Sequence, residues 1–334
     1  MRLLGHHPAR EAVTVKDFAV INGVRQGMFI QCANPEHPVL LFLHGGLPEY
    51  FLTDRYPTGL DNDFTVAWWE QRGAGLSYSP AIPPETMTAE QFIADTLSVT
   101  DYLRNRFDQE KIYLMAHSGG TFIGLQAAAR LPEAYHAYIG VAQVVDQRKS
   151  EMLAYEYMLE RFRQDGDRGM VRKLEAAPVT MEEGTSHRYL AVRDRAMHTL
   201  GVGTTRDMNS VLRGVVWPSL LSPRYTLAEK AGLWRGKRAA GVSALWGEML
   251  ATDLTKRVPE LALPAYFFHG ICDQTVSYGL ARSYAEKLKA PLAGFYTFYQ
   301  SAHSPLFEEP QKARRIMRDD VLAGTISLAD AKDA

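Results

Sequence analysis

The chain has 334 residues, 46% of them hydrophobic, and its 37 lysine and arginine residues nearly balance 38 aspartate and glutamate residues. This balance argues against a nucleic-acid-binding protein or one that binds anionic membranes. The two cysteines, Cys32 and Cys272, allow no disulfide framework and no metal-ligand spacing, and residues 1–15 lack the apolar segment of a secretory signal. We therefore expect a cytoplasmic protein without a membrane partner, whose oligomeric state the sequence leaves open.

Four β-prone segments open the chain. Residues 18–21 and 26–32 flank Asn22-Gly23, a dipeptide typical of a two-residue hairpin turn. Residues 38–43 and 64–69 are continuous apolar runs, as expected for strands that are buried on both faces. The pattern predicts a hairpin followed by two buried strands.

The next segments alternate between helix and strand. Thr88 and Gln91 form a capping-box pattern ahead of a helix that runs to about Phe107. Residues 112–130 are a β-prone run followed by a Gly- and Ala-rich helix, and residues 138–145 form a further buried strand. Strands that alternate with helices in this way predict an α/β fold, a mostly parallel sheet flanked by helices on both faces.

The pattern changes after Asp146. Residues 147–261 are mainly helical in pattern, richer in charge, and hold three of the five tryptophans. Strands and helices then alternate again, in residues 264–269, 276–288, 293–299 and 308–318. We predict one α/β core in two parts, residues 1–146 and 262–320, interrupted by a helical insertion of residues 147–261. The tail, residues 321–334, has little to bury and is expected to be peripheral.

Ser118 stands where the strand of residues 112–117 meets the following helix. Ala116 lies two residues before it and Gly120 two residues after it. Large side chains at those positions would clash in a sharp turn, so the pattern A-x-S-x-G predicts a nucleophile elbow that exposes the serine hydroxyl. Residues 112–129 contain no charge, but polar residues and glycines interrupt them, and the apolar part is too short to span a membrane.

A nucleophilic serine needs a general base and an acid that orients the base. Asp273 and His303 each follow a predicted strand, so both are expected with Ser118 at the carboxyl edge of the sheet. The order serine, aspartate, histidine is that of α/β-hydrolases. Asp146 is an alternative acid because it also follows a strand, but the 30 residues from Asp273 to His303 fit one helix and one strand and favour Asp273. No elbow surrounds Cys272, which we interpret as a buried bystander.

Acyl transfer also needs N–H donors for the negative oxygen that forms during attack. The strand of residues 38–43 ends in His44-Gly45-Gly46, whose paired glycines let the backbone approach a substrate. We expect the N–H groups of Gly46 and Gly119 to form this oxyanion hole. Residues 70–77 are rich in glycine but lack the spacing of a phosphate-binding motif, and we interpret them as a structural loop that braces the site.

These segments resemble the α/β-hydrolases, and among them the branch of the proline iminopeptidases (prolyl aminopeptidases). His44-Gly45-Gly46-Leu47-Pro48 is similar to the H-G-G-P-G of that branch, with Leu47 at the family's proline position. Residues 70–77 are similar to its D-Q-R-G-x-G-x-S, and Ala116-His117-Ser118-Gly119-Gly120 to its G-x-S-x-G. The resemblance covers residues 20–146 and 262–318. It implies an α/β-hydrolase fold in which the helical insertion is a cap that roofs the active site and selects substrates.

The resemblance also implies candidate substrate-binding residues. Proline iminopeptidases bind the free α-amine of the substrate through carboxylates of the cap. Glu151, Glu156 and Glu160 lie at helical spacing and are the candidates here, with a solvated helix face as the alternative. The predicted substrate-binding residues are His44, Glu151, Glu156 and Trp217, and the aromatic content of the insertion predicts a largely apolar pocket beneath it.

The sequence thus predicts a serine hydrolase for a small-molecule or short-peptide substrate, with no metal and no organic cofactor. A proline iminopeptidase-like aminopeptidase is the first interpretation. A carboxylesterase or lactonase for small to medium apolar acyl esters is the alternative, and a non-catalytic ligand-binding protein on the same fold is an alternative of another class. Haloalkane dehalogenases and epoxide hydrolases of similar fold should carry aspartate in place of Ser118 and are therefore disfavoured.

Overall fold

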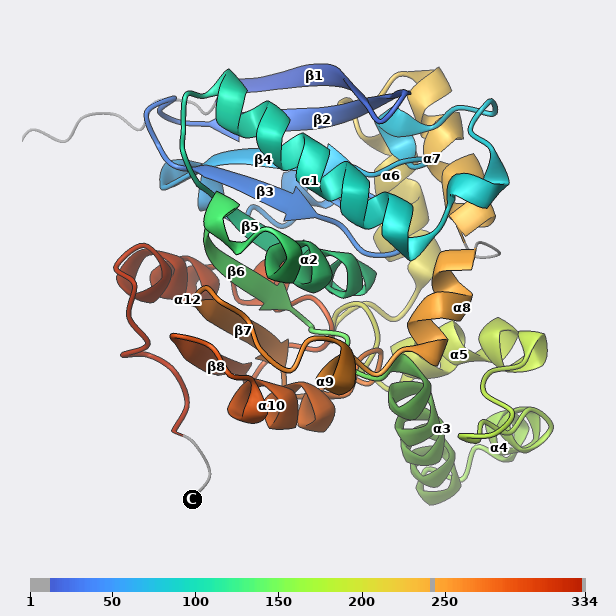
Figure 1. The fold of residues 1–334 in the computed structure, drawn as a ribbon. Coiled ribbons are helices and arrows are strands. Elements are labelled where there is room, and N and C mark those ends of the chain that lie inside the picture. The colour runs from blue at the N-terminus through green and yellow to red at the C-terminus, as the bar shows by residue number, and fades with distance from the viewer. Residues whose placement is uncertain (1–12, 241–243, 332–334) are drawn as a thin grey trace, which may run out of the picture.

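The structure, a computed structural model, describes residues 13–240 and 244–331. Within them one sheet has the strand order β1-β2-β4-β3-β5-β6-β7-β8 (Figure 1). The strands are β1 (Val13–Ile21), β2 (Val24–Cys32), β3 (Val39–Leu43), β4 (Thr65–Glu70), β5 (Ile112–His117), β6 (Tyr135–Val141), β7 (Ala265–Gly270) and β8 (Ala293–Phe298). β2 pairs antiparallel with β1 and β4, whereas the remaining neighbours pair parallel. The predicted mostly parallel sheet is confirmed.

The hairpin at the start of the sheet forms at the predicted turn. Asn22 and Gly23 have φ angles of 45° and 78°, the positive values that a two-residue turn of this type requires. β3, β4 and β5 are buried along their whole lengths, which explains why their sequences are continuous apolar runs rather than alternating ones.

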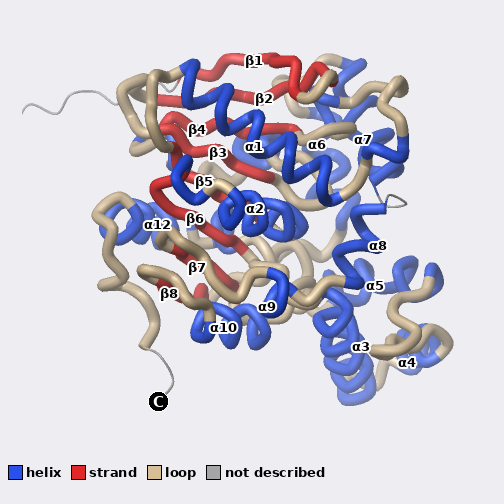
Figure 2. The backbone as a smooth tube through the Cα atoms, in the orientation of Figure 1, coloured by secondary structure: helices blue, strands red, loops and turns tan. Residues whose placement is uncertain are grey.

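Helices cover both faces of the sheet (Figures 1 and 2). α1 (Ala89–Arg106), α2 (Gly119–Arg130) and α10 (Tyr278–Lys287) share one apolar core with the sheet, and α11 (Pro305–Glu308) and α12 (Pro310–Ile316) share the core on the other face. The predicted cap of α1 is present, because Thr88 Oγ1 accepts a hydrogen bond from the Gln91 N–H. Short 3₁₀ and π turns span Tyr50–Asp54, Leu60–Asn62, Gly75–Ser77, Pro84–Thr86, Pro132–Ala134, Leu212–Val216 and Met317–Val321.

The end of the described chain packs against the sheet and is less peripheral than expected. Val321 is buried, and Ile326 and Leu328 pack against the core that contains α12. The carboxylate of Asp330 accepts a hydrogen bond from the Thr297 N–H of β8 at 2.9 Å. Apolar packing and hydrogen bonds to β8, including that of the Asp330 N–H to the Phe295 carbonyl at 2.8 Å, hold the segment in place, although its composition gives no strong periodic signal.

Residues 147–261, called the helical region from here on, lie between β6 and β7 in the chain. Their helices are α3 (Gln147–Gln164), α4 (Arg168–Glu175), α5 (His187–Thr199), α6 (Trp217–Leu221), α7 (Leu227–Ala240), α8 (Ala244–Ala251) and α9 (Leu254–Arg257). Figure 1 shows α3, α5 and α8 beyond the ends toward which the parallel strands point. The region has a small core of its own around Met158, Leu174 and Tyr189. Its last helix, α9, is joined to the chain just before the region, because the Leu254 N–H donates to the Val145 carbonyl at 2.8 Å.

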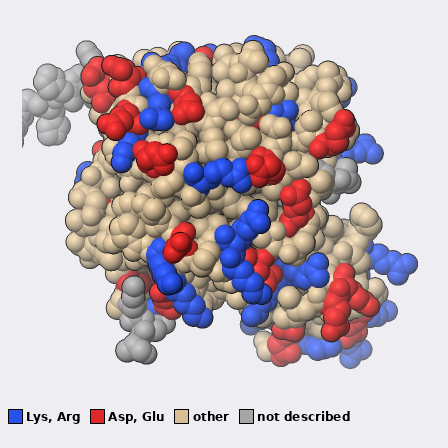
Figure 3. All heavy atoms as spheres, viewed as in Figure 1, with Lys and Arg blue, Asp and Glu red and all other residues tan. Residues whose placement is uncertain are grey.

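In the part of the chain that the structure describes, no helix combines the length and the apolar character that a membrane crossing demands. Acidic and basic side chains are intermixed over the face seen in Figure 3. This mixture agrees with the near balance of charges in the sequence.

Candidate active site

Ser118 lies in the turn between β5 and α2, with φ 55° and ψ −129°. A positive φ is uncommon for a residue with a Cβ and persists only where the surroundings hold it. Here α2 packs closely against the loop after β3: a Cβ on Gly120 would lie 2.5 Å from the His44 carbonyl oxygen, so only glycine fits. Strand, turn and helix thus present the Ser118 hydroxyl at the carboxyl edge of the sheet, which is the geometry of a nucleophile elbow.

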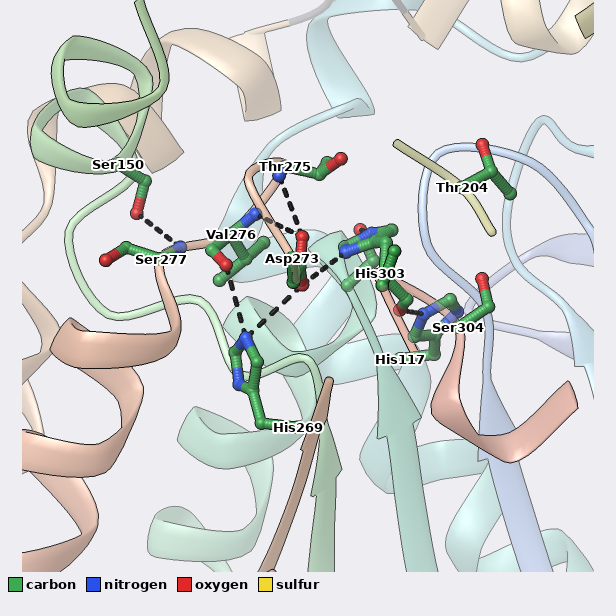
Figure 4. Close-up of polar contacts among 12 residues, drawn as sticks. His117, Ser150, Thr204, His269, Asp273, Thr275, Val276, Ser277, His303 and Ser304 are labelled. Carbon is green, nitrogen blue, oxygen red and sulfur yellow. Dashed lines mark hydrogen bonds and ion pairs between the residues drawn. The ribbon is translucent and has the colours of Figure 1, made fainter. Parts of the chain in front are cut away.

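His303 lies between Ser118 and Asp273. Its Nε2 is 2.8 Å from Ser118 Oγ, and its Nδ1 is 2.8 Å from Asp273 Oδ2; Figure 4 shows the contact with Asp273. A neutral imidazole that donates Nδ1–H to a carboxylate leaves Nε2 free to accept the serine O–H. Burial, helped by the nearby His117 and His269, lowers the pKa of His303 more than Asp273 raises it, so the ring stays neutral down to a lower pH than an exposed histidine.

The carboxylate of Asp273 is buried just after β7. Oδ1 accepts hydrogen bonds from the backbone N–H groups of Thr275 at 2.7 Å and Val276 at 3.1 Å, and Oδ2 lies 3.3 Å from His269 Nε2 (Figure 4). Burial raises the pKa of Asp273, but His303 and His269 together outweigh burial and hold it well below the ordinary range. An ionised Asp273 can therefore orient His303 and stabilise its protonated form.

The alternative residues lie in other surroundings. The carboxylate of Asp146 caps α3 by accepting from the Lys149 N–H at 2.9 Å, so Asp273 and not Asp146 contacts His303. Cys272 has a free thiol and is half-buried rather than fully buried as expected. Among residues 13–240 and 244–331, no three histidine, cysteine, aspartate or glutamate side chains are grouped so as to hold a metal ion.

The predicted donors Gly46 and Gly119 both line a cavity beside Ser118. The Gly119 N–H belongs to the first turn of α2, where amides have no acceptor within the helix, and the Ser118 side chain does not cap it. A Cβ on Gly45 would lie 2.8 Å from Ser118 Cβ, so glycine lets the loop after β3 reach the serine. Both glycines therefore lie beside the same cavity as the Ser118 hydroxyl, and their role as oxyanion donors stays a prediction.

His44 is held within this loop. Its Nε2 accepts from the Gln71 N–H at 3.1 Å, and its Nδ1–H donates to the Gly45 carbonyl at 2.7 Å. Burial lowers the pKa of His44 to about 4, so the ring is neutral at neutral pH. Gln71 follows β4 and also donates its side-chain N–H to the His44 carbonyl, and the next residue, Arg72, is buried against Asp95 at 2.7 Å. The Gly-rich loop after β4 therefore braces the site, and His44 lines the cavity with its nitrogens already bonded.

A second histidine, His117, directly precedes Ser118. Its Nε2–H donates to the His303 backbone carbonyl at 2.8 Å, and its Nδ1–H donates to Glu49 Oε1 at 2.8 Å; the ring lies beside His303 in Figure 4. Burial lowers the pKa of His117, but the Glu49 carboxylate, the His303 carbonyl and Asp273 together outweigh burial and raise it. Both nitrogens face oxygen acceptors, an arrangement that favours the imidazolium, and the His117–Glu49 pair links the loop of His303 to the elbow.

Two cavities meet at Ser118. The first has a volume of about 330 Å³ and is lined largely by apolar side chains, including Met87, Phe92, Ile123, Leu245 and Trp246. The second has a volume of about 250 Å³ and is lined by more polar residues, including Glu49, His117, His198, His303 and Ser304. Arg193, Asp194 and Lys237 of the helical region line both cavities, so this region forms the wall opposite the sheet.

Three of the four predicted substrate-binding residues line neither cavity. Glu151 is buried in α3, and its carboxylate accepts two hydrogen bonds of 2.7 Å from Arg193. Glu156 and Glu160 are exposed on the same helix, because residues five or nine positions apart from Glu151 do not all share its face. Trp217 is 51% exposed on α6. The glutamates do not form a common acidic wall, and only His44 of the four lies at the site.

The sequence does not identify five of the residues that line the cavities as site residues: Glu49, His117, Arg193, Asp194 and Lys237. Glu49 and His117 adjoin the glycine loop and the serine, and an ionisable residue beside a buried strand end is a signal that could have identified them. The other three lie on helices, where periodicity separates apolar from polar faces but does not indicate which polar side chain faces a cavity.

Comparison with known proteins places the chain among hydrolases. The sequence model of the alpha/beta hydrolase fold matches residues 38–310. A curated relative, probable aminopeptidase YbaC of Bacillus subtilis (strain 168), is 29% identical over 307 residues, 91% of this chain and 95% of that protein.

Two solved structures illustrate the range of activities on this fold. A proline iminopeptidase of Mycobacterium smegmatis has a TM-score of 0.64 at 14% identity and covers 94% of this chain and 98% of its own. An epoxide hydrolase variant of Bacillus megaterium has a TM-score of 0.56 at 17% identity and covers 92% of this chain and 100% of its own. At such identities the likeness establishes the fold alone.

Proposed function

Because this chain belongs to the alpha/beta hydrolase fold family, we propose that it is a serine hydrolase with Ser118 as nucleophile, His303 as general base and Asp273 as the orienting acid. The observation that carries the proposal is the pair of 2.8 Å contacts that link Ser118 Oγ, the His303 ring and Asp273 Oδ2. General-base activation of a serine hydroxyl needs this arrangement.

In the first half-reaction Ser118 Oγ bonds to the carbonyl carbon of the substrate while its proton moves to His303 Nε2. The carbonyl oxygen becomes negative and is stabilised by the N–H groups of Gly46 and Gly119. The ionised Asp273 stabilises the imidazolium. The bond from the carbonyl carbon to the leaving nitrogen or oxygen then breaks, and that atom takes the proton from His303.

In the second half-reaction water attacks the acyl-enzyme. His303 Nε2 accepts a proton from the water, whose oxygen bonds to the acyl carbon, and the bond from that carbon to Ser118 Oγ breaks. Ser118 recovers its proton from His303. The products are a carboxylic acid and a free amine or alcohol, and no cofactor is consumed.

The first candidate activity is that of an aminopeptidase of the proline iminopeptidase kind. It is supported by the likeness, over nearly the full length of both chains, to a protein named as a probable aminopeptidase. The apolar lining of the first cavity fits the side chain of an N-terminal apolar residue such as proline. The helical region would then act as the cap that selects this residue.

A carboxylesterase or lactonase activity is the second candidate, and one observation favours it. The Glu151 carboxylate, the buried member of the predicted amine-binding group, is already bound by Arg193. A substrate with a free α-amine would therefore need another anionic partner, whereas an apolar acyl ester needs none.

The test compares purified protein on prolyl-p-nitroanilide and p-nitrophenyl butyrate, with Ser118→Ala as the matched control. A phosphonylating serine reagent, followed by mass spectrometry of the peptide that contains Ser118, gives a readout that does not depend on the substrate. We expect one phosphonyl group on Ser118 and Ser118-dependent release of p-nitrophenol or p-nitroaniline. An unlabelled Ser118 together with no turnover would reject the serine hydrolase and favour a ligand-binding protein.

The two substrates separate the two activities. Release from the prolyl amide supports the aminopeptidase, and release from the ester alone supports the esterase. Labelling of Ser118 without turnover of either substrate would support a serine hydrolase with a narrower specificity.

A further inference from the structure

Lys237 of α7 reaches the loop that carries a predicted oxyanion donor. Its Nζ lies 3.1 Å from the position that a Cβ on Gly46 would occupy. The Cβ position and the amide nitrogen of Gly46 are bonded to the same Cα, so the ammonium lies close to the point where a scissile bond would be held. Lys237 lines both cavities together with Ser118.

Lys237 also differs from the charged residues around it because its charge is not neutralised. Arg193 is paired with Glu151 and Asp194, and Glu49 is paired with His117. Within the described residues, the Lys237 ammonium forms no salt bridge or hydrogen bond, and Asp194, the carboxylate that raises its pKa from nearby, is itself paired with Arg193. The side chain as a whole is exposed, but nearby protein atoms partly desolvate its ammonium, and this lowers the pKa of Lys237. An uncompensated, partly desolvated cation at this place favours an anionic group on the substrate.

The position of His303 indicates which part of the substrate faces each cavity. In the tetrahedral intermediate the leaving atom must point toward His303, which protonates it, and the acyl substituent must point away. Of the two cavities, His303 lines only the second, which therefore takes the leaving group. Its volume of about 250 Å³ is below the range of sites for drug-sized ligands, so the leaving group must be small.

We propose that Lys237 binds a carboxylate on the leaving group, attached to the carbon that carries the scissile nitrogen or oxygen. The preferred leaving groups are then free α-amino acids, released from dipeptides, or α-hydroxy acids, released from their esters. A carboxylate further along the leaving group would lie beyond the ammonium, because Nζ lies next to Gly46, the residue that carries a predicted oxyanion donor. The inference rests on the proposed function and adds a substrate class to it.

The test uses substrate pairs that differ only in this carboxylate. One pair is prolyl-alanine and prolyl-alanine amide; the other is O-butyryl lactate and O-butyryl lactamide. We expect the acid of the pair that matches the enzyme's activity to have a kcat/KM about tenfold higher than its amide, mainly through KM, as one charge-assisted hydrogen bond provides. Lys237→Met should bring this ratio to about one, and Lys237→Arg should retain part of it.

Arg235→Met is the matched control, since it removes an exposed cation from the same helix that lines neither cavity. It should leave the ratio of acid to amide unchanged. If the wild-type protein hydrolyses both members of a pair equally, Lys237 does not bind the carboxylate. The proposal of a serine hydrolase would be unaffected by that result. A Lys237→Met variant that slows both members equally would also overturn the role of Lys237. Absence of turnover together with an unlabelled Ser118 would instead overturn the proposed function.

Discussion

The α/β core and the helical region hold their buried polar groups by different means. In the core, the carboxylate of Asp273 accepts two backbone N–H groups just beyond a strand end, and Ser118 is fixed by a turn of the backbone itself. In the helical region, the carboxylate of Glu151 is held by side chains, those of Arg193 and Tyr189 among them. Backbone positions follow from the local sequence and the topology of the sheet, whereas side-chain pairs follow from how helices pack.

The largest expected effect tests whether the core residues act as a unit. Ser118→Ala should lower kcat/KM by about 10⁴-fold or more, because the hydroxyl is the proposed nucleophile. His303→Ala should cause a similar loss, and the double variant should lose little beyond either single variant. Kinetics on the better of the two chromogenic substrates measures this. Losses that multiply in the double variant would show that the two residues act separately.

The next effect concerns the helical region. Glu151→Gln leaves the Arg193 guanidinium with the exposed Asp194 carboxylate as its remaining anionic partner, and should lower the free energy of unfolding by about 1.5–3 kcal/mol. Urea unfolding followed by circular dichroism measures the loss. Glu151→Gln combined with Arg193→Met should cost less than the sum of the single changes, since the pair is then removed together. If Glu151→Gln instead lowers the free energy of unfolding by less than about 1 kcal/mol and raises KM for prolyl substrates, Glu151 would be an amine-binding residue after all.

The pH dependence of activity tests the electrostatics of the core. Only neutral His303 accepts the serine proton, so kcat/KM should rise with pH through the pKa of His303 and fall about tenfold per unit below it. Because burial lowers that pKa, the midpoint should lie below 6.5. Asp273 raises the pKa of His303, so Asp273→Asn should move the midpoint still lower. An acid limb centred above 6.5 would contradict this assignment.

The smallest expected effect is on thermal stability, and it tests whether the two regions unfold together. Thr88 caps α1 in the core and Ser186 caps α5 in the helical region, each by accepting one backbone N–H. Thr88→Ala and Ser186→Ala should each cost about 1 kcal/mol. In a single cooperative unit both variants shift the same thermal transition. A shift from Ser186→Ala that leaves a separate core transition unmoved would show that the helical region melts independently.

The site in the core was open to prediction because its residues follow strands. Ser118, Asp273 and His303 each come after an apolar run, and parallel strands bring such positions to one edge of a sheet. Glu151 was open to prediction only as a polar residue on a helix. Its partner Arg193 is 42 positions away, and nothing local to either residue indicates that they meet. The position of Lys237 is equally hard to predict from the sequence, because its place over Gly46 depends on how α7 packs against the core.

The point where the helical region begins lies beside the start of its last helix, α9. Asp146 and Asp253 form a β-bridge, and the Leu254 amide bonds to the Val145 carbonyl at 2.8 Å. A chain that leaves the sheet and returns to the same point can change in length or content without displacing β6 or β7. If the proposed function holds, substrate range is therefore separable from chemistry in this protein. Replacing the segment between these two points should then alter which substrates are accepted while Ser118, His303 and Asp273 stay in place.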